Sequence, residues 1–105
     1  MIDIIVYVKD TKYTGLKVSG HAKFSEEGKD IVCAAVSVLT INLANSIESF
    51  CDDDFTVDSD DGFFNFTLSD RSEKSGVLLD SCILGLMDIG EGYSEFIKIN
   101  LQEVK

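Results

Sequence analysis

The sequence predicts an α+β fold in the order β-β-α-β-β-α-β, a five-stranded sheet with two helices packed on one face. Three observations lead to this prediction. Apolar and polar residues alternate in four short segments, as they do in half-buried strands, and a fifth, residues 2–8, is apolar throughout apart from Asp3, as in a well-buried strand. In two longer segments apolar residues recur at spacings of three and four, as on one face of a helix. A length of 105 residues, 45% of them hydrophobic, predicts a single domain, residues 1–105, with one modest core.

The first two strands are predicted at residues 2–8 and 13–19, with a turn at residues 10–12 between them. Alternate positions on one face of each strand are apolar and should face the core: Ile2, Ile4, Val6 and Val8 in the first strand, Leu16 and Val18 in the second. The polar residues 23–30 that follow predict a loop.

The first helix is predicted to begin at Ile31 and to run for about twenty residues. Its apolar stripe consists of Val32, Ala35, Val36, Leu39, Leu43, Ile47 and Phe50. Asp30 is the predicted N-cap, because a carboxylate at that position can accept a backbone N–H of the first turn. Since the helix carries so little charge, we expect the rest of the protein to cover most of it.

The second half of the chain predicts a hairpin, a helix and a last strand. The hairpin has strands at residues 55–58 and 64–68, with Asp61 and Gly62 forming the turn. The helix should be capped by Ser72 and end near Gly90 or Gly92. Its predicted core residues are Leu79, Cys82, Ile83, Leu86 and Met87, and the last strand is expected at residues 95–101. These patterns do not predict the order of strands in the sheet.

The charge of the chain is strongly negative. It has 9 Lys and Arg against 19 Asp and Glu, a net charge of −10. This balance argues against broad electrostatic binding to nucleic acid or to an anionic membrane, since both need a basic surface. Between Glu48 and Asp70 there are eight acidic residues and no basic one. Such a surface either aids solubility or steers a basic partner toward the protein.

The cysteines and the N-terminal residues predict a cytoplasmic protein with free thiols. Cys33, Cys51 and Cys82 are odd in number and widely spaced, with no C-x-x-C motif, so no disulfide framework is expected. The N-terminal residues contain no basic leader followed by a cleavage site, and no run of about eighteen apolar residues occurs.

Two residues could carry catalytic chemistry, the single histidine His21 and Cys33. With Asp30 as the cap, Cys33 would be the third helical residue. There the partial positive charge and unpaired N–H groups favour a thiolate and can hold an oxyanion. His21, at the end of the second strand, could act across the loop as its general base. A buried structural cysteine and an unrelated surface histidine remain the alternative.

Other residues near this pair have weaker assignments. Ser37 lies one turn beyond Cys33, where it could contact substrate, orient His21 or bond back to the carbonyl at position 33. Gly20 and Gly28 flank the loop and are candidate hinges for a substrate lid. No metal site is predicted, because the histidine and the three cysteines lack the paired spacing of zinc ligands, and no cofactor motif is present.

The residues around the pair resemble a known signature. Gly20-His21-Ala22, followed by Gly-Lys-Asp-Ile-Val-Cys-Ala-Ala-Val-Ser at residues 28–37, is similar to the motif of the ribosomal-processing cysteine proteases, the Prp family. Gly85-Leu86 and residues 93–97 resemble the C-terminal segment of that family. The resemblance extends over essentially the whole chain.

The resemblance implies a cytosolic, homodimeric cysteine endopeptidase that removes a short N-terminal extension from a protein of the large ribosomal subunit. Its partner would be that ribosomal protein precursor, and a loop between His21 and Cys33 would move to admit the peptide. The resemblance assigns Cys33 as the nucleophile and His21 as the general base, with Asp30 and Ser37 as supporting residues.

Two other functions remain open from the sequence. The chain could be a non-catalytic acidic module that binds a basic ribosomal protein, with Cys33 merely buried. It could also be a thiol redox sensor in which Cys33 reacts with Cys51 or Cys82. Alkylation distinguishes the non-catalytic module from a protease, because a buried structural thiol should resist it. Mutating Cys51 and Cys82 distinguishes the redox sensor from a protease, because only the sensor should need them.

Overall fold

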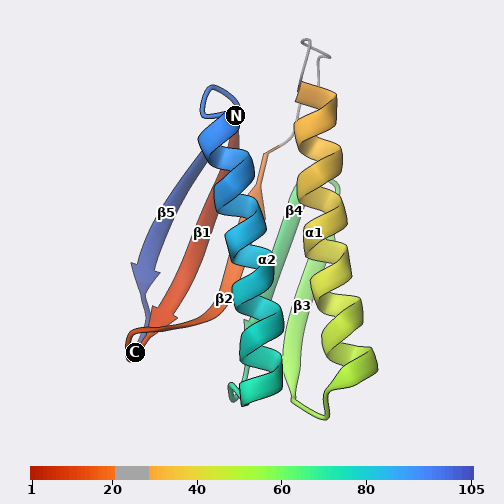
Figure 1. The fold of residues 1–105 in the computed structure, drawn as a ribbon, viewed down its shortest axis with the longest axis vertical. Helices are drawn as coiled ribbons and strands as arrows, with labels where there is room; N and C mark the ends of the chain where they lie inside the picture. Colours follow the sequence, from red (N-terminus) through yellow and green to blue (C-terminus); the bar gives the residue numbers. More distant parts are fainter. Residues whose placement is uncertain (21–28) are drawn as a thin grey trace.

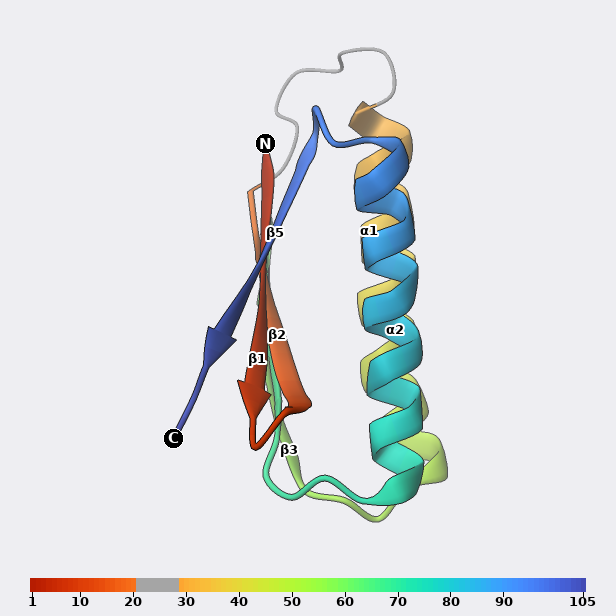
Figure 2. The same cartoon turned by 60° about the vertical axis from the view of Figure 1, so that its left-hand side comes forward.

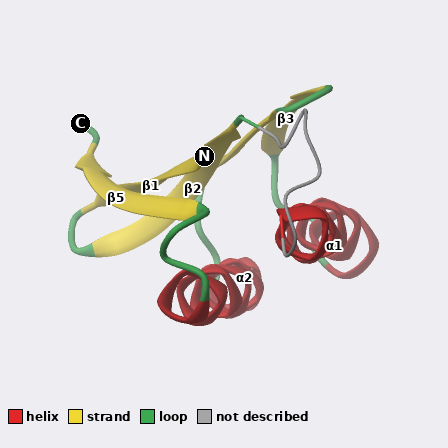
Figure 3. Ribbon diagram, turned by 90° about the horizontal axis from the view of Figure 1, so that it is seen from above, coloured by secondary structure: helices red, strands yellow, loops and turns green. Residues whose placement is uncertain are grey.

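The computed structural model describes residues 1–20 and 29–105, and its elements follow the predicted order (Figure 1). Their bounds are β1 Ile2–Lys9, β2 Lys12–Ser19, α1 Lys29–Phe50, β3 Phe55–Asp60, β4 Phe63–Leu68, α2 Glu73–Gly92 and β5 Ile97–Glu103. Both helices pack on one face of the sheet, and no helix covers the other face in the described part of the chain (Figures 2 and 3). The predicted fold class is confirmed.

The five strands lie in the order β3-β4-β2-β1-β5. β1–β2, β2–β4 and β3–β4 pair antiparallel, whereas β1 and β5 pair in parallel, so the sheet is mixed. α2 forms the crossover that returns the chain from the β4 side of the sheet to its β5 edge. This order places the β3–β4 hairpin beside the end of β2.

Both predicted hairpin turns are present. Asp10 and Thr11 form the first turn with positive φ angles of 52° and 67°, and Lys12 already belongs to β2. Asp61 and Gly62 form the second turn, where Gly62 has a φ of 71°, a value that glycine adopts at little cost.

The core lies between the sheet and the two helices. Its fully or nearly buried residues include most of those predicted at one face of β1, β2, β4 and α2: Ile2, Ile4, Val6, Leu16, Val18, Phe64, Phe66, Leu68, Leu79, Cys82, Ile83 and Leu86. Val8 and Met87, also predicted there, are only partly buried. From α1 the core takes Val32, Val36, Leu43 and Ile47. The alternation and the helical periodicity therefore identified most of the core correctly.

α1 differs from its prediction in two respects. It begins at Lys29, so Asp30 lies inside the first turn, and its assignment as the N-cap was wrong. The rest of the chain covers only part of the helix, because α2 and one face of the sheet are its only neighbours among the described elements. Ile31, Val38 and Phe50 are each about two-thirds exposed. By length and composition residues 31–50 could cross a membrane, a property shared with core helices.

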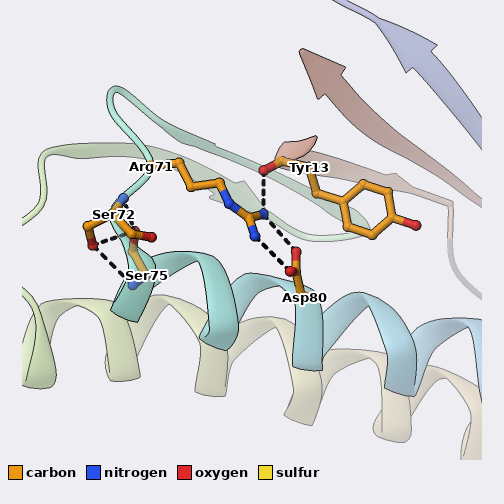
Figure 4. Close-up of polar contacts among 5 residues, drawn as sticks. All are labelled: Tyr13, Arg71, Ser72, Ser75 and Asp80. Carbon is orange, nitrogen blue, oxygen red and sulfur yellow. Dashed lines mark hydrogen bonds and ion pairs between the residues drawn. The ribbon is translucent and has the colours of Figure 1, made fainter. Parts of the chain in front are cut away.

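The predicted cap of α2 is confirmed. Ser72 and Ser75 form a capping box, in which each side chain accepts a hydrogen bond from the other residue's backbone N–H (Figure 4). Next to the box the Arg71 guanidinium makes two hydrogen bonds of 2.7 Å to Asp80, and it donates a third to the Tyr13 carbonyl oxygen at 2.9 Å. Arg71 thereby ties the start of α2 to β2.

Candidate active site

A cleft of about 460 Å³ opens at the end of the sheet where α1 begins. One wall is α1, with Cys33, Ser37 and Ile41, and the floor includes the buried side chains of Val18 and Phe64. A larger cleft, of about 950 Å³, lies at the opposite end between the β1–β2 turn and the start of α2. Its lining contains no cysteine, so the smaller cleft is the better candidate for cysteine chemistry.

Cys33 is partly exposed in this cleft, as a nucleophile requires. It is the fifth residue of α1 rather than the third, because the helix begins at Lys29. The influence of a helix N-terminus falls off within the first turn. Cys33 therefore lies further from the helix N-terminus than the sequence suggested.

Ser37 lies on the same face as Cys33, as its spacing predicted, and lines the same cleft. Within the described residues its hydroxyl makes no hydrogen bond. The bond back to the carbonyl at position 33 is thus absent. Thr40 makes the back-bonds instead, donating to the carbonyl oxygens of Val36 and Ser37 at 3.0 and 3.2 Å. Among the described residues nothing competes with a ligand in the cleft for the Ser37 hydroxyl.

Gly20 is the point where β2 ends at the cleft. Its φ is +94°, and a Cβ at this position would lie 2.4 Å from the Met1 carbonyl oxygen. Its N–H donates a hydrogen bond of 2.9 Å to the Gly62 carbonyl oxygen in the β3–β4 turn. Only glycine fits this conformation and this space, and the bond holds the hairpin turn against the end of β2.

Two of the predicted site positions, His21 and Gly28, lie outside the described residues. Asp30 is placed only as a residue of the first turn of α1. Their predicted roles as base, hinge and supporting residue remain predictions. His21 is the next residue in sequence after Gly20, which lines the Cys33 cleft.

The second wall of the cleft was missed by the sequence reasoning. It is formed by the β3–β4 turn region, residues 59–63, which includes Asp60 and Asp61. These residues are at least 26 positions from Cys33 in sequence, and no spacing or motif connects them. Only the strand order, which places β4 next to β2, brings the acidic turn to the nucleophile.

The other two cysteines do not fit a redox pair with Cys33. Burial raises the pKa of Cys82 to about 12, and its thiol donates a hydrogen bond to the Leu39 carbonyl oxygen at 3.5 Å. Cys51 follows the last residue of α1, so at 1.5 Å per residue it lies about 27 Å along the helix from Cys33. A disulfide needs Cα atoms within about 7 Å. No cluster of three metal-ligating side chains occurs in residues 1–20 and 29–105.

A small α+β protein with an accessible thiol in a cleft at the start of a helix defines a candidate cysteine hydrolase. The family model of the cysteine protease Prp matches residues 1–98. The chain belongs to the Prp family of ribosomal-processing cysteine proteases, and the protein is a cysteine protease. The resemblance seen in the sequence is confirmed, and it favours the protease over the non-catalytic module.

Relatives and solved structures agree with this assignment. The ribosomal processing cysteine protease Prp of Staphylococcus aureus is 31% identical over 104 residues, covering 95% of this chain and 98% of its own. The Bacillus subtilis protein of the same name is 25% identical over 97 residues, covering 86% and 87%. A crystal structure of the S. aureus protease with a substrate peptide matches with a TM-score of 0.90 and 29% identity, covering 97% of this chain and all of that one.

Proposed function

We propose that this protease is a cytoplasmic endopeptidase that removes a short N-terminal extension from a large-subunit ribosomal protein, with Cys33 as nucleophile and His21 as general base. The observation that carries the assignment is the cleft shared by Cys33 and Gly20, the residue directly before His21. The S. aureus and B. subtilis relatives are ribosomal processing proteases, which supports the substrate class.

The proposed chemistry has two steps. The Cys33 thiolate attacks the scissile carbonyl carbon, a C–S bond forms, and the C–N bond breaks as His21 gives its proton to the leaving amine. Water then attacks the thioester with His21 as base, which releases the new carboxylate and restores the thiol. Ser37 supports substrate binding from the next turn of α1, and Asp30 is a supporting residue of the site in the first turn. Gly20 and Gly28 serve as hinges at the two ends of the segment between β2 and α1.

The test compares the wild-type protein with Cys33→Ala on a large-subunit ribosomal protein that still carries its extension. Mass spectrometry should find one trimmed product with the wild type and intact substrate with the variant. Ser37→Ala is a useful third arm, because it leaves the nucleophile in place. Trimming by Cys33→Ala at the normal rate would refute the nucleophile, and intact substrate in every tube would refute the proposed substrate.

The acidic surface supports a steering role toward this substrate. Ribosomal proteins are basic, and the segment between Glu48 and Asp70 holds eight acids without a base. Added salt should therefore lower cleavage efficiency more for the full-length precursor than for a short peptide. Equal salt sensitivity of the two substrates would contradict steering.

The proposed enzyme works as a homodimer. Large apolar side chains are exposed on both helices, with Ile31 and Val38 on α1 and Val77 and Leu84 on α2 each more than 60% exposed. Apolar side chains left exposed on two adjacent helices support an interface on this face of the protein. Sedimentation should give the mass of a dimer, and Val38→Lys should shift it toward the monomer. A wild-type protein that sediments as a monomer at micromolar concentration would refute the dimer.

A further inference from the structure

β3 forms one edge of the sheet, and in the described part of the chain no strand pairs with its outer side. It stands at the end of the strand order and pairs only with β4 among the described strands. All of its residues after Phe55 are exposed. An edge of this kind presents N–H and C=O groups that can pair with a further extended chain.

The ladder between β3 and β4 determines which groups point outward. The Ser69 N–H donates to the Asp54 carbonyl oxygen at 3.0 Å, directly beyond the pair Phe55–Leu68. Hydrogen-bonded pairs alternate in an antiparallel ladder, so residues 54, 56, 58 and 60 bond to β4. The N–H and C=O groups of Val57 and Ser59 therefore point to the free edge.

This free edge leads into the Cys33 cleft, because Ser59 lines that cleft. Val57 lies opposite the buried Phe66, so its side chain is on the helix-facing side of the sheet, yet it is 45% exposed. Ile41, on the α1 wall of the cleft, is 55% exposed. An extended peptide beside β3 would cover apolar surface that the chain itself leaves open.

Charge indicates which kind of peptide fits. Asp58 and Asp60 alternate with Val57 and Ser59 and so lie on the opposite, helix-free face, and β3 contains no basic residue. Pairing β3 with a second copy of itself would place like charges side by side, which is unfavourable. A segment with Lys or Arg on the same face would be attracted.

We propose that the substrate binds as an added strand on the free edge of β3, with its main chain bonded to Val57 and Ser59 and a basic side chain facing Asp58 and Asp60. The pairing delivers the scissile bond to the cleft beside Cys33. This inference rests on the proposed function, since it names how that substrate is held.

The first test is a scan of the substrate with N-methyl groups. Peptides that span the processing site, each with one methylated amide, are cleaved by the wild-type protein. Because only alternate amides of a strand face its partner, kcat/KM should fall at least about fivefold at every second position and little between them. Cleavage without this alternation overturns the strand pairing alone, whereas an unmodified peptide that is not cut refutes the proposed function and the inference with it.

The second test removes one donor from the protein. Val57→Pro deletes an N–H that β4 does not use, and proline is tolerated at strand edges. Val57→Ala is the matched control, since it truncates the side chain but keeps the N–H. We expect the KM of the proline variant to be about tenfold above that of the alanine variant, with similar thermal transitions for the two. Equal KM values in both would overturn the proposal.

The third test concerns charge. The wild-type protein should cleave a peptide with Lys at the position facing Asp58 and Asp60 at a higher kcat/KM than the same peptide with Gln there. The double variant Asp58→Asn with Asp60→Asn should cleave the two peptides at equal kcat/KM. The control pair Asp52→Asn with Asp88→Asn changes the net charge equally at exposed sites that do not line the cleft, and it should keep the preference for Lys. Loss of the preference in both pairs would assign it to net charge and overturn the local contact.

Discussion

Replacing Gly20 with alanine should destabilise the protein strongly. An alanine there would adopt a φ of +94°, and its Cβ would lie 2.4 Å from the Met1 carbonyl oxygen, well inside contact distance. A left-handed conformation costs a non-glycine residue about 1–2 kcal/mol, and relieving an overlap in packed structure costs about 1–3 kcal/mol. The free energy of unfolding should therefore fall by at least about 2 kcal/mol, which lowers Tm by at least about 8 °C in a domain of this size.

The control for this experiment is Gly92→Ala at the last residue of α2. No heavy atom lies within 4 Å of a Cβ built at Gly92, and its φ is not in the left-handed region. Alanine should leave stability unchanged or raise it by about 0.5–1 kcal/mol, because it loses less backbone entropy than glycine on folding. Differential scanning calorimetry of both variants measures the effect. Equal Tm values for the two would refute the assignment of Gly20 as a position that only glycine can fill.

Three further predictions concern thiols, acid and the α2 anchor. Because burial raises the pKa of Cys82 to about 12, iodoacetamide at pH 8 should leave Cys82 unlabelled in the native protein, by peptide mass spectrometry, and label it after denaturation. The hydrogen bonds from Ser75 and Ser72 lower the pKa of Asp53 below its ordinary 3.8, so this carboxylate stabilises the fold above about pH 4. That stabilisation is lost as pH falls through the lowered pKa, and Asp53→Asn should flatten the acid limb of a stability–pH curve. Arg71→Ala should cost about 1–2 kcal/mol in urea unfolding, since the bonds to Asp80 and Tyr13 are lost but Asp80 is 45% exposed and partly screened. An unchanged urea midpoint would contradict an anchoring role.

Secondary structure was predictable because it depends on local periodicity. The alternation of Ile2, Ile4 and Val6 marked the buried face of β1, and the Ser72 cap marked the start of α2 within one residue. The start of α1, by contrast, was predicted wrongly. Asp30 is a good capping residue, yet α1 begins before it, and this moved Cys33 from the first turn of the helix to the second.

The burial of α1 was overestimated for a different reason. Its composition identifies an apolar helix, but composition does not say how many neighbours the fold supplies. One face of the sheet and α2 cover Val32, Val36, Leu43 and Ile47, while Val38 on another side of the helix stays 67% exposed. The number of neighbours depends on strand order and on other chains, neither of which the periodicity encodes.

The sequence by itself determined the element order and most of the core residues, because local patterning carries that information, and a short motif in it predicts the pair His21 and Cys33. Only the tertiary structure decided that the acidic β3–β4 turn forms the second wall of the Cys33 cleft. It also decided that the free edge of β3 leads into that cleft. Both depend on the pairing of β4 with β2, a contact between segments about fifty residues apart. The hydrophobic alternation of a strand shows which of its faces is buried, but it does not show which other strand lies beside it.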